Sequence, residues 1–392
     1  MRTLTVLCDC VGDVGGAERY WETVVPALVA RGTNVRILAR TISDPGRFGT
    51  DAREVRWSDE DGDASAGAAE LVADELRRNP PDAVVTASVF DGAVLDAVRA
   101  AGPRWFARIH DHRAFCPTGD RVFPQFSAPC SAPMGNACRA STLVRGCVHG
   151  PRPSSFRHIA AREALRDRIA HADGVLVSSA HMRATCTVNG IAERRVAVTP
   201  PPLPEEAFAS PPAPRPAVRT LLFASRLTPR KGLRSLIAAL ALLAPHERPR
   251  LVVAGEGDAE ERDARDDAER LGVAVVWRGK LSAEQVRAAM DEACAVVVPS
   301  LWPEPFGLVG IEAQARGRPA VAYGVGGIGD WIHGAGIVVE RGDENALAGA
   351  IRRILDEQLW NELSAAARRR AEDYRVDRHV DRLLQLLKGD DA

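Results

Sequence analysis

The sequence predicts an α/β protein built from two doubly wound, Rossmann-like domains, and three observations support this prediction. The chain has 392 residues, enough for two or three domains at roughly 150 residues each. Short segments rich in Val and Leu alternate with single helical patterns, which indicates parallel sheets covered by helices on both faces. A proline-rich segment divides the chain into halves of similar length. Hydrophobic residues make up 46% of the chain, which supplies more than one core.

The first half, 1–199, begins with a strand, a glycine turn and a helix that ends before Gly32. The spacing of apolar residues then predicts further strands. The expected elements of this half are the strands Leu4–Cys8, Val35–Leu38, Ala83–Ser88 and Trp105–Ile109 and the helix Glu18–Ala30.

The segment 200–218 is predicted to be a stiff, extended linker. Eight prolines lie between Thr199 and Arg219, and so many prolines cannot form a helix or a central strand.

The second half, 219–373, alternates strand and helix regularly. Its expected strands are Thr220–Ser225, Leu251–Ala254, Val273–Trp277, Ala295–Pro299 and Pro319–Tyr323, and its expected helices are Leu233–Leu243, Glu260–Leu271, Ala283–Ala293 and Leu308–Ala315.

The charge and apolar patterns exclude several classes of protein. The 51 Lys and Arg residues nearly balance the 52 Asp and Glu residues, so no nucleic-acid partner is expected. No apolar stretch approaches the roughly 20 residues that span a bilayer, and the first residues resemble a strand more than a signal peptide. A cytoplasmic location is therefore expected, with the eight cysteines as reduced thiols or metal ligands. Abundant Ala, Arg and Gly with little Lys is typical of a high-GC bacterial source.

The segment Pro303–Glu312, PEPFGLVGIE, places two glutamates around a predicted helix start. The backbone N–H groups of Phe306, Gly307, Leu308 and Val309 would be free to bind a phosphate or sugar hydroxyls. The alternative is an ordinary helix whose first turns carry acidic residues.

A second candidate site, SRLTPRKG at Ser225–Gly232, follows a strand directly. Arg226 and Lys231 could both reach an anion at the carboxyl end of the sheet and neutralise a pyrophosphate without a metal. A basic turn that caps a helix is the alternative. The turn at Gly255 occupies the same position after the next strand. Candidate ligand loops at successive strand ends support one another as parts of a single binding site.

In the first half, Gly15 and Gly16 form a glycine turn between strand and helix, which could bring N–H groups to a phosphate. The full G-x-G-x-x-G spacing is absent, so no dinucleotide is indicated. A tight turn without a ligand is the alternative.

These motifs, GGAERYWETVVPALVARG, SRLTPRKG, VVAGEGD, EPFGLVGIEAQARGRPAVAYGVGG and IVVERGDENALAGAI, resemble the family-4 glycosyltransferases of GT-B fold. The resemblance covers nearly the whole chain and is strongest from about 221 to 355. It implies two Rossmann-like domains that face each other across a cleft, and a last segment, 374–392, that forms a helix packed back on the first domain.

The resemblance also implies retaining transfer of a hexosyl group from a nucleotide-sugar to an acceptor hydroxyl, with no cofactor or metal. Arg226 and Lys231 would bind the diphosphate, Glu312 the ribose and Glu304 the transferred sugar. His110 would contact that sugar and assist the chemistry. The remaining donor contacts implied are Gly15, Gly16, Gly255, Gly279, Lys280, Leu281, Phe306, Gly307, Leu308 and Val309.

Two positions depart from the family pattern. Ser225 replaces the glycine that usually precedes the phosphate-binding arginine. The acidic residue that usually follows the GG turn, here Gly326 and Gly327, appears as Asp330, after an extra Gly329. A UDP-sugar is the expected donor. A GDP-sugar, a phosphorylase or epimerase, and a non-catalytic nucleotide-sugar-binding protein are the alternatives. The acceptor and the oligomeric state do not follow from the sequence.

The segment 110–150 carries four of the eight cysteines, Cys116, Cys130, Cys138 and Cys147. They could bind zinc, but the usual C-x2-4-C pair is missing. A loop with reduced cysteines over the acceptor site is the preferred interpretation, and no metal site is assigned.

Two charged segments complete the candidates. Asp59–Asp63, DEDGD, contains a D-x-D pattern but is interpreted as a solvated acidic loop. The basic run Arg152–Arg168 is interpreted as a solvated helix face, with peripheral association with the inner face of a membrane as the alternative.

Overall fold

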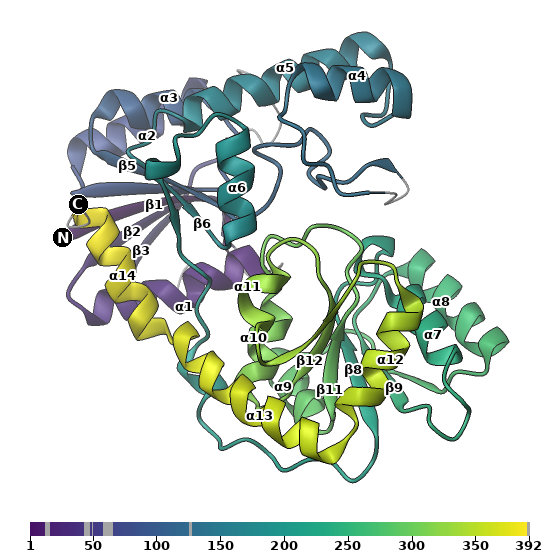
Figure 1. The fold of residues 1–392 in the computed structure, drawn as a ribbon. Coiled ribbons are helices and arrows are strands. Elements are labelled where there is room, and N and C mark those ends of the chain that lie inside the picture. Colours follow the sequence, from purple (N-terminus) through teal and green to yellow (C-terminus); the bar gives the residue numbers. More distant parts are fainter. Residues whose placement is uncertain (12–15, 43–47, 49, 58–65, 125–127, 390–392) are drawn as a thin grey trace. The chain divides into compact units, whose positions relative to one another are not determined.

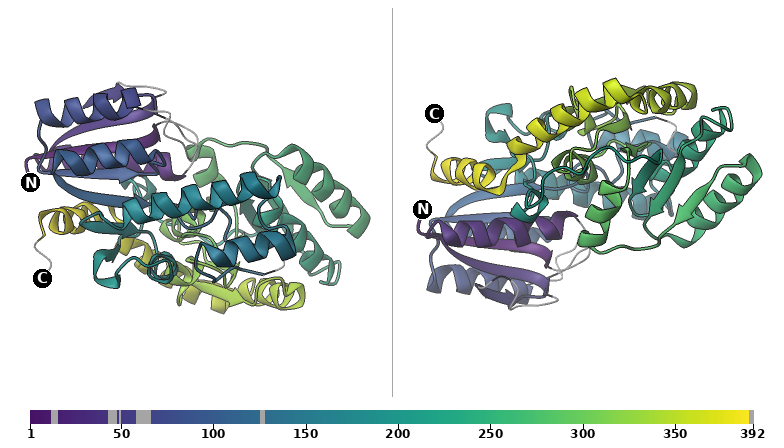
Figure 2. Two further views of the ribbon diagram at one scale, coloured as in Figure 1. Left: turned by 90° about the horizontal axis from the view of Figure 1, so that it is seen from above. Right: turned by 90° about the horizontal axis from the view of Figure 1, so that it is seen from below.

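The computed structural model describes residues 1–11, 16–42, 48, 50–57, 66–124 and 128–389 (Figures 1 and 2). The chain divides into two compact units. The first contains Met1–Pro202 together with Val376–Ala392, and the second contains Leu203–Arg375. Within the described residues, no helix is long and apolar enough to cross a membrane.

The first unit is built on a parallel seven-stranded sheet in the order β3-β2-β1-β4-β5-β6-β7. Side chains of its strands alternate between two cores, as the period of two in a strand requires. Leu4, Val6 and Cys8 face one core, and Leu7 faces the other. The strands are β1 (Thr3–Val11), β2 (Asn34–Ile42), β3 (Asp51–Glu54), β4 (Ala83–Ala87), β5 (Arg104–Ile109), β6 (Gly174–Val177) and β7 (Val196–Val198).

Helices cover both faces of this sheet (Figure 1). On one face lie α2 (Ala66–Arg78), α3 (Gly92–Ala101), α5 (Arg152–Ile169) and α6 (Ala180–Val188), and on the other lie α1 (Gly16–Ala30) and α14 (Val376–Lys388). The helix α4 (Asn136–Arg145) buries none of its residues.

The last helix, α14, belongs to the first unit although it follows the whole of the second unit in sequence. It lies beside α1 (Figures 1 and 2). Its apolar residues Val376, Val380, Leu383 and Leu387 join Trp21 in one core. Arg31 at the end of α1 donates to Asp381 at 2.7 Å.

The second unit contains a parallel six-stranded sheet in the order β10-β9-β8-β11-β12-β13. Its strands are β8 (Thr220–Ala224), β9 (Arg250–Ala254), β10 (Val275–Trp277), β11 (Ala295–Val298), β12 (Ala320–Tyr323) and β13 (Gly336–Val339). Apart from two exposed residues, Arg250 and Val276, the strand residues are buried or half-buried in β8, β9, β10, β11 and β12, as expected of a parallel sheet.

The helices of the second unit pack in two groups. On one side α7 (Leu233–Ala241) contacts α8 (Asp258–Leu271) and α12 (Glu344–Ile354). In the other group α10 (Leu308–Ala315) contacts α9 (Ala283–Asp291), α11 (Ile328–Ile332) and α13 (Glu357–Ala371).

The proline-rich segment is not a separate linker over the whole of 200–218, because the structure groups it with the second unit from Leu203 onward. Its carbonyl groups accept hydrogen bonds from buried arginines of that unit. Arg318 donates to Pro214 O at 3.2 Å, and Arg316 donates to Ser210 O at 3.4 Å. Prolines keep this segment extended, so its carbonyls are available to side-chain donors.

Candidate functional site

The loops that follow four neighbouring strands of the second unit are joined to one another. The loop after β8 pairs with the turn after β9, because Ser225 N donates to Ala254 O at 3.0 Å and Leu227 N donates to Glu256 O at 2.8 Å. The loops after β8 and β11 are joined by Leu301 N and Arg230 O at 2.8 Å. Gly327 N donates to Glu304 O at 2.7 Å and joins the loops after β11 and β12. The carboxyl edge of the sheet is therefore one connected surface.

Gly255 and Gly257 are required by close packing. A Cβ at Gly255 would lie 1.8 Å from Ser225 O, and one at Gly257 would lie 1.9 Å from Leu227 O. Between these two anchors lies Arg226, which is exposed and whose guanidinium makes no hydrogen bond or ion pair to another described residue. The backbone of Arg226 is thus fixed, while its cation remains available to a ligand.

Lys231 and Glu304 form an ion pair across the point where the strand order reverses. They follow β8 and β11, neighbours in the sheet that are separated in sequence by three α-helices and two strands. Lys231 Nζ lies 2.6 Å from Glu304 Oε1, and Ser300 Oγ donates to the same oxygen at 2.6 Å. The side chains are 18% and 7% exposed. Ligands of doubly wound sheets bind at this kind of reversal.

Glu304 is held in its ionised form. Burial raises the pKa of this carboxyl, but the charge of Lys231 and the hydrogen bonds from Lys231 and Ser300 outweigh burial, and the net pKa lies below its usual range. The carboxylate can therefore accept hydrogen bonds from sugar hydroxyls. Trp302 lies beneath the neighbouring cations, with its ring 4.7 Å from Arg230 Cζ and 5.5 Å from Lys231 Nζ.

The helix α10 begins at Leu308, directly after Glu304, Phe306 and Gly307. Gly307 has φ +97°, in the left-handed region, where it caps the helix. Trp331 Nε1 donates to Phe306 O at 2.7 Å and fixes the approach to the helix. Leu308 and Val309 supply first-turn N–H groups, and Glu312, half-buried, lies one turn further along. Glu304 therefore lies in the loop before α10, and Glu312 lies just after the first turn of that helix.

The remaining predicted donor residues of the second unit lie after β10. Gly255 N donates to Gly279 O at 2.8 Å, so the turn after β9 contacts the segment after β10 that is predicted to contact the donor. Lys280 is exposed and Leu281 is half-buried.

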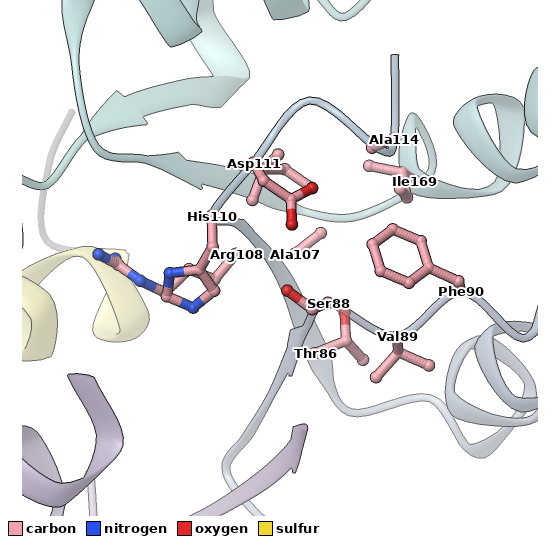
Figure 3. Close-up of a pocket in the computed structure, with 11 residues that line it drawn as sticks. Thr86, Ser88, Val89, Phe90, Ala107, Arg108, His110, Asp111, Ala114 and Ile169 are labelled. Carbon is pink, nitrogen blue, oxygen red and sulfur yellow. The ribbon is translucent and has the colours of Figure 1, made fainter. Parts of the chain in front are cut away.

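In the first unit, His110 directly follows β5 at the carboxyl edge of the sheet. A pocket here is lined by residues that follow or end β4 and β5, among them Ser88, Phe90, Arg108 and His110 (Figure 3). Ser88 has φ +56°, uncommon for a residue with a side chain and typical of functional sites. Burial lowers the pKa of His110 well below its usual value, and the charges of Arg108 and Arg113 lower the pKa further. His110 is thus a neutral imidazole.

Two other predictions concern the glycine turn and the cysteines. Gly15 and the Asp59–Asp63 loop lie outside the described residues, and Gly16 is the first residue of α1. Cys116, Cys130, Cys138 and Cys147 all line one pocket of the insertion. In the described part of the chain, no group of three or more His, Cys, Asp or Glu residues is arranged to hold a metal ion.

Sequence patterns alone did not indicate Ser300 or Trp302 beside Glu304, or the contact that Gly326 makes with it. Gly326 has φ +64°, and a Cβ there would lie 2.3 Å from Glu304 O. The GG turn was visible as a motif, but its contact with Glu304 arises only from the neighbouring positions of β11 and β12.

Family comparisons agree with this arrangement. Residues 14–207 match the model "Glycosyltransferase Family 4", and residues 206–374 match "Glycosyl transferases group 1". The chain belongs to the family-4 glycosyltransferases. Its two-sheet architecture is the GT-B fold of this family, whose members transfer sugars from nucleotide-sugar donors.

Individual relatives show how far the similarity extends. The chain is 28% identical over 400 residues to D-inositol 3-phosphate glycosyltransferase of Acidothermus cellulolyticus, covering 95% of this chain and 85% of that one. It is 35% identical over 149 residues to an uncharacterized glycosyltransferase of Methanocaldococcus jannaschii, where the match covers only 37% of each protein. The crystal structure of Anabaena HepE in complex with UDP-glucose shares the fold, with a TM-score of 0.72, 17% identity and 98% and 99% coverage.

Proposed function

We propose that this glycosyltransferase is a retaining, metal-independent enzyme that moves a hexosyl group from a UDP-sugar to an acceptor hydroxyl. The main observation that supports this proposal is the Lys231–Glu304 ion pair at the strand-order reversal, beside the exposed cation of Arg226. Membership of the family supports the nucleotide-sugar donor, and the similar fold of HepE bound to UDP-glucose supports uridine.

Two cations support binding of the diphosphate through side chains. Arg226 is anchored through the backbone of its neighbours and has no competing partner among the described residues. Lys231 is held by Glu304 at 2.6 Å, close to the N-terminus of α10. Both cations and the helix N-terminus favour a doubly charged leaving group.

In the proposed reaction, the bond between the anomeric carbon and the diphosphate oxygen breaks while a bond to the acceptor oxygen forms on the same face of the sugar. The acceptor proton passes to a diphosphate oxygen, and the electron pair of the broken bond stays with the diphosphate. Arg226 and Lys231 stabilise the negative charge that develops there. Glu304, which is ionised, accepts hydrogen bonds from hydroxyls of the transferred sugar, and Glu312 does the same for the ribose.

His110 is proposed to contact the transferred sugar as a neutral imidazole. A neutral ring can exchange hydrogen bonds with a hydroxyl without placing a positive charge beside the anomeric carbon. That carbon itself becomes positive in the transition state of glycosyl transfer. The low pKa of His110 supports this role.

A ligand panel tests the donor, and product analysis tests the reaction. UDP, GDP, ADP and their sugars are added separately, and the melting temperature is recorded, because a ligand that binds only the folded protein raises its stability. UDP-sugars are expected to give the largest rise. Greater stabilisation by GDP-sugars than by UDP-sugars would identify a GDP-sugar as the donor instead.

Turnover of the preferred donor is then followed with and without simple acceptors by NMR of the anomeric proton. Retained configuration and full activity in excess EDTA are expected. An inverted product or an absolute need for added magnesium would refute the proposed mechanism, and binding without any turnover would indicate a non-catalytic protein.

A further inference from the structure

A cluster of buried polar residues lies against His110 in the first unit. It consists of Tyr20 from α1, Arg108 from β5, Thr199 after β7 and His379 from α14, and we call it the Arg108 cluster. Arg108 and Tyr20 are 1% and 3% exposed, and His379 is 8% exposed. None of these residues takes part in the chemistry described above.

The period of two along β5 explains why the cluster meets His110. Trp105, Ala107 and Ile109 pack into one core, and Phe106 packs into the other. Arg108 and His110 therefore extend to the Phe106 side, which α1 and α14 cover. Figure 3 shows both side chains on the same side of the pocket, away from Phe90.

The geometry of the cluster is tight. Arg108 Cζ lies 3.7 Å from the centre of the Tyr20 ring, and Arg108 donates to Thr199 Oγ1 at 2.8 Å and to Thr199 O at 3.2 Å. The Tyr20 ring meets His110 edge-on at 5.4 Å. On its other side, the Tyr20 hydroxyl lies 2.7 Å from His379 Nε2. Tyr20 thus contacts Arg108, His110 and α14 at once.

Arg108 is a costly residue for a purely structural role. No carboxylate pairs with it anywhere in the described chain, and its buried Nε has no hydrogen-bond partner there. A buried cation without a counter-ion opposes folding, so an apolar residue of similar size would serve the core better. The destabilisation that the buried cation of Arg108 causes is consistent with a role of this residue in the adjacent site.

We propose that Arg108 and Tyr20 are positioning residues for His110, and that His379 anchors Tyr20 through the C-terminal helix. The cation of Arg108 disfavours a second positive charge on His110, and the Tyr20 ring limits the orientations of the imidazole. His110 Nε2 is buried and has no partner among the described residues, so no hydrogen bond within the described protein fixes the imidazole through this atom. This inference rests on the proposed function, because it concerns the same histidine.

The charged and titratable groups around His110 agree on the sign of the effect. Arg108 on β5 and Arg113 in the following loop both lower the pKa of His110, in addition to burial. Arg113 is paired with Asp111 at 2.8 Å, so its charge is partly compensated. Burial brings the pKa of His379 to about 3, and burial raises the pKa of Tyr20, so both flanking groups are neutral at pH 7.

The test uses the full-length chain with histidines labelled at ¹³Cε1. Arg108→Met removes the charge, Arg108→Lys keeps it, and Tyr20→Phe removes only the bond to His379. Arg104→Met is the matched control, because Arg104 lies on the same strand and donates to Leu387 O of α14 at 2.8 Å but does not contact His110. The His110 resonance is assigned from its loss in His110→Gln.

In Arg108→Met, the pKa of His110 is expected to rise and kcat to fall about tenfold or more, as misplacement of a reacting group does. The fall should be larger at pH 6 than at pH 8, with little change in the donor KM. Arg108→Lys should restore the low pKa, and Tyr20→Phe should lower kcat while the charge, and so the pKa, is kept. Arg104→Met should match the wild type in both.

An unchanged His110 titration in Arg108→Met, or an equal loss of kcat in Arg104→Met, would overturn the inference. If Arg108→Met does not fold, the comparison of Tyr20→Phe with Arg104→Met decides, because equal kcat in these two variants contradicts positioning through Tyr20. The NMR titration does not require turnover. A wild type without transferase activity would therefore refute the proposed function and leave the interaction of Arg108 with His110 separately measurable.

Discussion

Replacing Lys231 by methionine tests whether the ion pair at the strand-order reversal exists in solution as the structure shows it. The substitution keeps an unbranched side chain but removes the ammonium group, and with it the interaction with the Trp302 ring, and leaves Glu304 without its counter-ion. Glu304 then remains buried, 7% exposed, and keeps the hydrogen bond from Ser300 at 2.6 Å. We expect a marked loss of stability, although Lys231 carries no part of the hydrophobic core.

The size of the loss follows from burial. Removing one partner of a buried ion pair costs about 3–5 kcal/mol. Lys231 is 18% exposed and Ser300 still supports the carboxylate, so the lower end, about 3 kcal/mol, is expected here. For a domain of this size, that corresponds to a melting temperature lower by roughly 6–12 °C.

The pH dependence identifies the cause. In the wild type the folded pKa of Glu304 is below its ordinary value of 4.5, so its contribution to stability is present above pH 4.5 and is lost as the pH falls through the folded pKa. Without Lys231, burial instead raises the pKa, and the ionised carboxylate destabilises the fold at pH 7. The deficit of the variant should therefore be largest at neutral pH and should begin to shrink above pH 4.5, as the pH falls through the raised pKa of Glu304.

Melting of the wild type, Lys231→Met, Glu304→Gln and the double variant between pH 4 and pH 8 completes the assay. The double variant should be more stable than the sum of the two single losses predicts, because no charge is then left buried alone. Arg226→Met, which alters an exposed cation without partners among the described residues, is the control and should melt within about 0.5 kcal/mol of the wild type. A pH-independent deficit, or strict additivity, would show that the pair is not buried and coupled.

Four further predictions concern the ligand site, the turn beside it and the insertion. Arg226→Ala should weaken UDP binding by about 1.5–3 kcal/mol, as loss of a charged hydrogen bond does, and an unchanged Kd by calorimetry would remove Arg226 from the diphosphate site. Glu312→Ala should weaken UDP, whereas Glu304→Gln should spare UDP affinity and lower turnover; the reverse pattern would exchange their roles. Gly326→Ala should destabilise the protein by roughly 2 kcal/mol or more, because the φ of Gly326 is +64° and a Cβ there would lie 2.3 Å from Glu304 O. Gly329→Ala is the control and should not destabilise the protein, because a Cβ at Gly329 would have no atom within 4 Å. Burial, and then the neighbouring thiols Cys116, Cys130 and Cys138, raise the pKa of Cys147 to about 11. Alkylation of Cys147 by iodoacetamide at pH 8, followed by mass spectrometry, should therefore be roughly 100-fold slower than that of an ordinary thiol. Alkylation at the rate of the unfolded chain would contradict this thiol environment.

The sequence predicts many of the buried elements of the fold but not all of them. The helix Leu308–Ala315 is found with the predicted bounds, and the predicted strands differ from the observed ones by a few residues at most, but β6, which is buried throughout, was not predicted. By contrast, β3 (Asp51–Glu54) has the sequence DARE and no apolar period. It is a strand because it pairs with β2 at the edge of the sheet, and pairing of this kind leaves no local pattern.

Local motifs identified the candidate loops but not the contacts between them. Lys231 and Glu304 are 73 residues apart, and Tyr20 and His379 are 359 residues apart. Such pairs depend on strand order, which spacing along the chain does not specify. Burial at Glu304 and Arg108 likewise depends on residues that pack from distant elements, so the pKa shifts could not be predicted from the motifs.

The position of α14 has a consequence for biosynthesis. The ribosome makes the first unit's sheet and α1 early, but the helix that covers α1 emerges only after the whole of the second unit. Until then the apolar face around Trp21, and the buried arginine beside it, lack their final cover, so the first unit matures last although it begins first. Premature termination before Val376 should therefore yield a chain whose second unit folds while its first unit binds chaperones, and the soluble yield of nested C-terminal truncations would reveal that order.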